Sequence, residues 1–182
     1  MTETLLKSIL FGFGVYSIFI LLIKPIFSDA IKIKIEKFDN SACSIIPVIG
    51  LIYLLNWLGT LFFQYNNLED SAEIYQLKSR LFGTNWFGYW LQPSLFLSSQ
   101  LLWFKKLRKI ILIRLLIALA LTVSIESIVI SLTSLHRDYM PSTWSVPLSS
   151  KIIEWIWSIG IFTSITIIFD LIKTRLKIKN DV

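Results

Sequence analysis

The sequence predicts an all-α integral membrane protein with five transmembrane helices, four of them arranged as a bundle. Of its 182 residues, 54% are hydrophobic and only 16% are charged, and the mean hydropathy is +0.66. In soluble proteins about a quarter of the residues are charged. Residues 40–68 and 81–104 contain no charged side chain. Each stretch exceeds the roughly 20 residues that a helix needs to cross a hydrocarbon core.

The whole chain, residues 1–182, is expected to form a single transmembrane domain. Apolar stretches between charged breaks place its spans near residues 6–25, 43–65, 82–103, 109–134 and 150–172. The first span is interpreted as a retained helix, because Lys24 and Pro25 follow it instead of a small-residue cleavage site. Residues 31–35 alternate Ile and Lys, which fits an extended or interfacial segment and equally an ordinary loop.

The basic residues predict the orientation. Five crossings put the two termini on opposite sides, and Lys and Arg then divide twelve to five between the sides, with Arg114 inside a span. Cytoplasmic loops carry the excess of basic residues, so we expect an inner (cytoplasmic) membrane location with the N-terminus outside and the C-terminus cytoplasmic. The cytoplasmic set is Lys24, Lys32, Lys34, Lys37, Lys105, Lys106, Arg108, Lys109, Lys173, Arg175, Lys177 and Lys179.

The composition excludes several chemistries. One Cys, Cys43, and one His, His136, are too few for a zinc site, a bis-histidine haem or an iron–sulfur cluster within this chain. Cys43 is expected to have a packing role. The sequence contains neither a glycine-rich phosphate loop nor a Ser-His-Asp arrangement, so no catalytic residue is predicted. The net charge of +6 is interpreted as topology, and no nucleic-acid partner is expected.

Charged side chains within spans need protein or water around them. Glu126 lies well inside the fourth span, where a carboxylate costs about 2.5–3.5 kcal/mol. It is a proton-relay candidate or a hydrogen-bonded structural group. Arg114 precedes it by about 18 Å of helix, too far to pair, and is expected to snorkel to the cytoplasmic interface. Asp170 is expected to pair locally with Lys173.

Uncharged polar and aromatic side chains have simpler expected roles. Asn56, Gln64 and Gln100 are expected to be buried and to join helices through hydrogen bonds. Most tryptophans lie near span ends, as in the aromatic belts at membrane interfaces, whereas Trp57 lies deep in the second span.

The predicted outer loop, residues 134–144, concentrates unusual residues. It contains the single histidine beside an Arg-Asp pair and ends in an aromatic residue. It is interpreted as a docking face or a structural latch. The candidate docking residues are His136, Arg137, Asp138 and Trp144.

Ordered motifs carry a family resemblance over about residues 50–172. The run Trp86–Trp90, the stretch Ser99–Arg108, and Glu126 with the loop through Trp144 resemble the polysulfide-reductase-type (NrfD-like) membrane subunits of alternative complex III. Those subunits have ten spans, and this chain resembles their second half. The family's quinol site is associated with the first half, so it cannot be assigned to residues here. Ser127 also stands where relatives place Arg next to the membrane glutamate.

The resemblance implies a noncatalytic membrane subunit of a respiratory quinol-oxidising electron-transfer complex. Partner membrane subunits, including haem or iron–sulfur subunits, would carry the redox centres. The chain alone would bind no cofactor, although contact with quinone or lipid is consistent with it. Two alternatives are a membrane scaffold or assembly factor for a non-redox partner, and a proton-conducting module that uses Glu126.

Overall fold

The computed structural model describes residues 2–68, 70–84, 86–123 and 148–180, and every regular element in them is helical. The predicted all-α class is therefore confirmed for these residues. The elements are α1 (Thr2–Ile23), η1 (Lys24–Ile26), α2 (Asp29–Asn66), α3 (Ser71–Phe82), α4 (Trp86–Leu97), η2 (Ser98–Trp103), α5 (Lys105–Lys109), α6 (Ile111–Thr122) and α8 (Leu148–Asn180).

Three helices in the described part of the chain are long and apolar enough to cross a membrane. They are α1, α2 and the stretch Ile152–Leu176 of α8. The helix α6 is also apolar but shorter. These helices are compatible with a multi-pass membrane protein. The stretch predicted as the third span, residues 82–103, is not one continuous α-helix, because it contains the end of α3, a break at Gly83, α4 and the 3₁₀ helix η2.

The helix α2 is longer than its apolar segment. It begins at Asp29 and runs for 38 residues, so the Ile-Lys alternation of residues 31–35 lies in its first turns. The interpretation of that segment as extended backbone or a loop is therefore wrong. The helix continues through the charged residues because nothing in residues 29–38 breaks it, and hydropathy marks the membrane crossing rather than the helix end.

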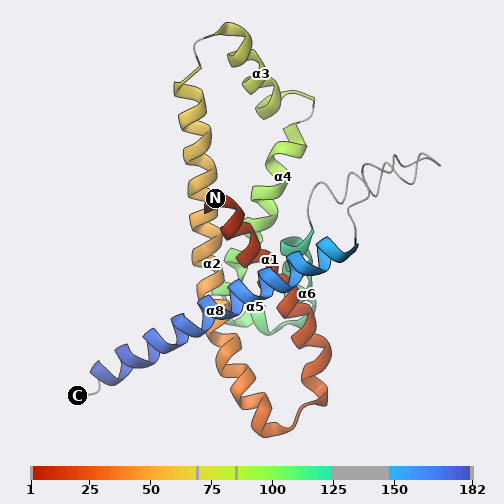
Figure 1. Ribbon diagram of the computed structural model, residues 1–182, viewed down its shortest axis with the longest axis vertical. Helices are drawn as coiled ribbons and strands as arrows, with labels where there is room; N and C mark the ends of the chain where they lie inside the picture. The colour runs from red at the N-terminus through yellow and green to blue at the C-terminus, as the bar shows by residue number, and fades with distance from the viewer. Residues whose placement is uncertain (1, 69, 85, 124–147, 181–182) are drawn as a thin grey trace, which may run out of the picture.

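The helix α1 lies between α6 and α8, and glycines on two of its faces allow this close packing (Figure 1). A Cβ atom on Gly12 would collide with the backbone carbonyl of Ser158 in α8. On Gly14 it would lie 2.6 Å from Thr122 Cγ2 and 2.8 Å from the Ala118 carbonyl oxygen in α6. Small residues at such positions let membrane helices approach closely.

The helix α8 crosses α1 and α2 obliquely (Figure 1). Aromatic rings fill the core at this crossing. Phe162 of α8 packs edge-on against Phe13 and Phe38, with ring centroids 5.8 and 6.3 Å away, and at a tilt against Tyr16 at 5.2 Å. Cys43 is 1% exposed within the same core, which confirms its packing role.

The helices α2 and α4 form a second, antiparallel unit. Tyr53 packs against Phe96 with ring centroids 4.7 Å apart, and Trp57 packs against Trp90 at 5.0 Å. The helix α3 connects the two at the end far from η1 (Figure 1). We call residues 54–90, which comprise the end of α2, α3 and the start of α4, the arm.

Candidate functional site

The residues predicted to be functional lie outside the described part of the chain. Glu126 and the docking residues His136, Arg137, Asp138 and Trp144 all fall within residues 124–147. Their proposed roles therefore stay predictions. The described residues bring together a different set of polar side chains. They lie at the end of the molecule that carries Lys24, Lys32, Lys105 and Arg108, which we call the basic end.

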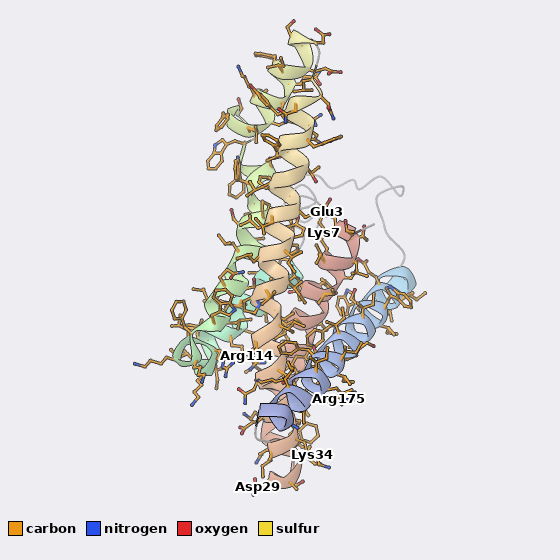
Figure 2. The ribbon with its side chains drawn as sticks, turned by 90° about the vertical axis from the view of Figure 1, so that its left-hand side faces the viewer. Glu3, Lys7, Asp29, Lys34, Arg114 and Arg175 are labelled. Carbon is orange, nitrogen blue, oxygen red and sulfur yellow. The ribbon has the colours of Figure 1, made fainter. Side chains whose placement is uncertain are left out.

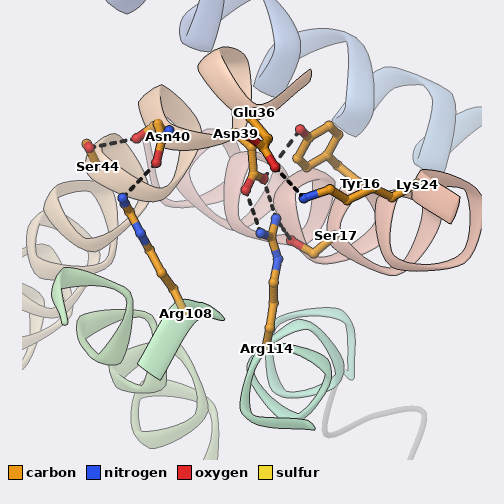
Figure 3. A network of polar contacts seen from close by, with 9 residues as sticks. All are labelled: Tyr16, Ser17, Lys24, Glu36, Asp39, Asn40, Ser44, Arg108 and Arg114. Carbon is orange, nitrogen blue, oxygen red and sulfur yellow. Dashed lines mark hydrogen bonds and ion pairs between the residues drawn. The ribbon is translucent and has the colours of Figure 1, made fainter. Parts of the chain in front are cut away.

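An ion pair between α6 and α2 lies at the centre of this set (Figure 3). Arg114 directs both terminal nitrogens at the carboxylate of Asp39, with Nη1 2.6 Å from Oδ2 and Nη2 bonded to Oδ1. Nη2 also lies 3.5 Å from the Ser17 hydroxyl, and the Tyr16 hydroxyl donates to Asp39 over 3.5 Å. Three helices, α1, α2 and α6, therefore meet at one carboxylate.

The expectation that Arg114 snorkels to the interface is wrong. Arg114 is only 8% exposed and points inward. The physical reason is Asp39, which lies one residue before the charge-free stretch of α2 and offers a two-oxygen acceptor that matches the guanidinium fork. The sequence predicts both charges near the cytoplasmic ends of their spans, which is the only hint that they pair. They are 75 residues apart, so the hint does not identify Asp39 as the partner.

A second arginine reaches α2 one residue further along. Arg108 of α5 donates from Nη2 to the Asn40 side-chain oxygen at 2.7 Å, and the Ser44 hydroxyl donates to the Asn40 carbonyl at 2.7 Å. Figure 3 shows Arg108 and Arg114 extending in the same direction from neighbouring helices toward α2. Unlike Arg114, Arg108 binds a neutral group, so no carboxylate offsets its charge there.

These side chains border a cleft of about 1150 Å³ at the basic end. Residues of α1, η1, α2, η2, α5, α6 and α8 line it. Its charged lining consists of seven basic and two acidic residues, which are Lys24, Lys32, Lys105, Arg108, Lys109, Arg114, Lys173, Glu36 and Asp39. The cleft is therefore strongly cationic.

Two further polar predictions can be compared with the structure. Gln100 donates from Nε2 to the Pro47 carbonyl at 2.7 Å, which confirms that it joins two helices. Asp170 does not pair with Lys173. It accepts a 2.7 Å hydrogen bond from Ser41 and lies 3.7 Å from Lys37, because α8 crosses α2 at this position.

The prediction that Asn56 and Gln64 are buried is wrong for Gln64 and only partly right for Asn56. Gln64 is exposed, and Asn56 is half-buried. Within the described ranges, neither side chain makes a hydrogen bond to another helix. Both residues lie in the arm, where α2 has few neighbouring helices.

Among the described residues, no group of three or more His, Cys, Asp or Glu side chains is placed to hold a metal ion. The arrangement that is present can bind an anion through converging cations and can tie helices together through Asp39. Comparisons with protein-family models, curated proteins and solved structures found no match for this chain. The resemblance described above therefore stays a prediction.

Proposed function

We propose that this chain is a noncatalytic membrane subunit of a quinol-oxidising electron-transfer complex. The proposal includes five crossings, with the basic end cytoplasmic and the N-terminus outside. The observation that carries the subunit role is the arm. The electron-transfer part rests on the resemblance of residues 86–108 and 126–144.

The arm projects past the helices that surround the rest of α2. At 1.5 Å per residue, the 22 residues of α1 span about 33 Å and the 38 residues of α2 about 57 Å. The two helices are joined at one end by η1, and the N-terminus lies beside the middle of α2 (Figure 1). The far end of α2, with α3 and the start of α4, therefore has no other described helix beside it.

The arm carries large apolar side chains on its surface. Phe63 is 68% exposed and Phe87 is 59% exposed, and Phe62, Tyr75, Phe82 and Trp86 are exposed as well. Lipid covers such side chains within the roughly 30 Å hydrocarbon core, which accommodates about 20 residues of a helix. The charge-free part of α2, residues 40–66, spans about 40 Å and is longer than that core, so the end of the arm extends beyond the hydrocarbon region and needs cover from protein. A neighbouring membrane subunit provides that cover.

Two of the three stretches that carry the resemblance lie on this unit or continue from it, and the third, Glu126 through Trp144, lies outside the described residues. Residues 86–90 form the first turn of α4 within the arm, and residues 99–108 continue through η2 and α5 to the cationic cleft. One continuous stretch thus connects the face proposed for a partner with the basic end. The resemblance associates the family's quinol site with the half that this sequence does not resemble, so quinol oxidation and the redox centres are assigned to partner subunits.

Purification of the tagged full-length chain from its native membranes in mild detergent tests this function. We expect haem-containing or iron–sulfur subunits to copurify, detected by the haem absorption spectrum and by electron paramagnetic resonance. Phe63→Ala combined with Phe87→Ala should lower their recovery about tenfold, as truncation of central interface aromatics does. Phe19→Ala, on α1 and 56% exposed, is the matched control and should leave recovery unchanged.

Three results would contradict the proposal. Recovery of the chain alone would remove the subunit role. Recovery of a partner without haem or iron–sulfur centres would replace it with the scaffold alternative. Equal losses from the arm variant and from Phe19→Ala would mean that the arm is not the contact.

A further inference from the structure

The cleft at the basic end holds more positive charge than the protein itself neutralises. Three of its seven basic side chains have carboxylate partners: Lys24 with Glu36 at 2.9 Å, Lys32 with Asp29 at 3.1 Å, and Arg114 with Asp39. The other four form no ion pair within the described ranges. They are Lys105, Arg108, Lys109 and Lys173.

These four cations come from two separate parts of the chain. Lys105, Arg108 and Lys109 lie on α5, and Lys173 lies near the end of α8. Like charges repel, so gathering them around one cleft has an electrostatic cost. A bound anion removes that cost.

Arg108 is already held in a binding orientation. It is half-buried, and its hydrogen bond to the Asn40 side chain fixes one of its five N–H groups. The remaining N–H groups are available on a planar fork whose spacing matches two oxygens of a phosphate. The neutral Asn40 orients this fork without neutralising it.

Apart from Asn40 and Ser44, the uncharged part of the wall is mostly apolar. Ile20 and Leu21 of α1, Leu102 and Trp103 of η2, and Ile111 of α6 line the same cleft. Trp103 is exposed, and tryptophan is enriched at the level of lipid headgroups. The cleft therefore combines a cationic part with a hydrocarbon-like part, as an amphiphile requires.

We propose that this cleft binds the phosphate headgroup of an anionic phospholipid, with the acyl chains along its apolar wall. Basic pockets between membrane helices on the cytoplasmic side bind such headgroups. The cleft exceeds the 300–1,000 Å³ of typical small-ligand pockets, so it accommodates a glycerophosphate group together with the first part of its chains. This inference does not depend on the identity of any partner subunit.

Lipid retention by the purified full-length protein in neutral detergent tests the proposal. Cardiolipin, phosphatidylglycerol and phosphatidylethanolamine are added at equal mole fractions, and bound lipid is measured by native mass spectrometry and by the shift in melting temperature. We expect the two anionic lipids to be retained at least tenfold more than phosphatidylethanolamine. Equal retention of all three would overturn the proposal.

Charge-removing variants locate the site. Arg108→Gln and Lys173→Gln should each reduce retention of anionic lipid about tenfold, the effect of losing one charge-assisted hydrogen bond. Lys106→Gln is the matched control, because Lys106 lies on the same short helix but does not line the cleft. Lys173 is exposed, so its substitution tests binding even where Arg108→Gln affects folding. Equal effects of Lys106→Gln and the other two variants would overturn the proposal.

Inorganic phosphate tests whether the cleft recognises a phospholipid headgroup or a soluble phosphate compound. We expect millimolar phosphate to raise the melting temperature little and to leave bound cardiolipin in place, because it lacks the acyl chains. If phosphate alone stabilises the protein as much as cardiolipin and displaces it, the site recognises a soluble phosphate compound and the lipid assignment is overturned.

Discussion

At the residue scale, the pairing of Arg114 with Asp39 decides how three helices meet. A guanidinium that is 8% exposed is tolerated only when a counter-charge accompanies it. Asp39 accepts from both terminal nitrogens and from Tyr16, so its carboxylate is the shared acceptor of α1 and α6. Arg114 Nε is buried without an acceptor in the described residues. Loss of Asp39 would therefore leave the guanidinium without a counter-charge, with only the 3.5 Å contact from Nη2 to the Ser17 hydroxyl remaining.

Removal of Asp39 should strongly destabilise the fold. We expect Asp39→Ala to lower the free energy of unfolding by about 3 kcal/mol, the cost of leaving one member of a buried pair alone. The double variant Asp39→Leu/Arg114→Met should recover most of that loss, because it removes both charges together. Denaturant titration followed by circular dichroism in mixed micelles measures the change.

Asp170→Ala is the control for that experiment. Its carboxylate is 26% exposed and lies 3.7 Å from Lys37, so its loss should cost no more than about 1 kcal/mol beyond the Ser41 hydrogen bond. If Asp39→Ala and Asp170→Ala destabilise the protein equally, the Arg114 pair does not have the structural importance assigned to it.

The residues of the candidate site show what sequence reasoning misses. Arg114 was recognisable as a charge within a span, but its partner was not, because hydropathy shows where helices lie along the chain and not which faces meet. Asp39 and Arg114 become neighbours only through the packing of α6 and α2 against α1. The basic residues of the cleft were identified as a topological signal, yet nothing local indicated that Lys173 of α8 and the basic residues of α5 would line the same cleft.

At the element scale, α1 is the helix around which the others pack. Gly12 and Gly14 lie on nearly opposite faces, about 200° apart at 100° per residue. One faces the α8 backbone and the other faces α6. In the sequence Phe11-Gly12-Phe13-Gly14, the two phenylalanine rings therefore pack against other aromatic side chains, and the two glycines let neighbouring helices approach closely. This makes α1 sensitive to small additions of volume.

A single methyl group at Gly12 should separate two helices. Its Cβ would collide with the Ser158 carbonyl, and backbone cannot move aside as a flexible side chain can. We expect Gly12→Ala to lower the free energy of unfolding by about 1–3 kcal/mol, the usual cost of overpacking. Gly160→Ala is the matched control in α8, where a Cβ meets nothing within 4 Å.

The control variant Gly160→Ala should not lower the free energy of unfolding. Alanine favours helix over glycine by up to about 1 kcal/mol, so Gly160→Ala is expected to be neutral or stabilising. The same denaturant titration compares the two variants. A Gly12→Ala protein as stable as the Gly160→Ala protein would show that α1 and α8 do not pack as closely as described.

Apolar stretches predicted the main elements but not their ends. The stretches near residues 6–25, 43–65 and 150–172 all lie largely within α1, α2 and α8. Helices α2 and α8 extend well beyond them, because a helix continues into the interface wherever residues such as Lys32 or Lys173 allow it. The break at Gly83 and the 3₁₀ turn of η2 leave no trace in hydropathy, so the segment around α4 was expected to be uniform.

At the scale of the whole molecule, the basic residues gather at one end. Segments around Lys34, Arg114 and Arg175 are far apart in sequence but lie at the same end, whereas Glu3 and Lys7 lie further toward the arm (Figure 2). The helix α3 occupies the opposite end (Figure 1). This segregation agrees with the twelve-to-five division that led to the predicted orientation, because cytoplasmic loops hold the basic excess.

Cysteine labelling in cells tests that orientation. The native Cys43 is buried and contributes little background, and Cys43→Ser removes it altogether. Lys106→Cys, on α5 at the basic end, should react with an impermeant thiol reagent only after the membrane is permeabilised. Glu73→Cys, exposed on α3 at the opposite end, should react in intact cells.

The helix α2 connects the two ends over about 57 Å, more than the thickness of the hydrocarbon core. Both positions reacting from the same side would mean that α2 does not cross the membrane. Reversed labelling would keep the crossing but place the cationic cleft on the outer side, which would contradict the orientation predicted from the basic residues.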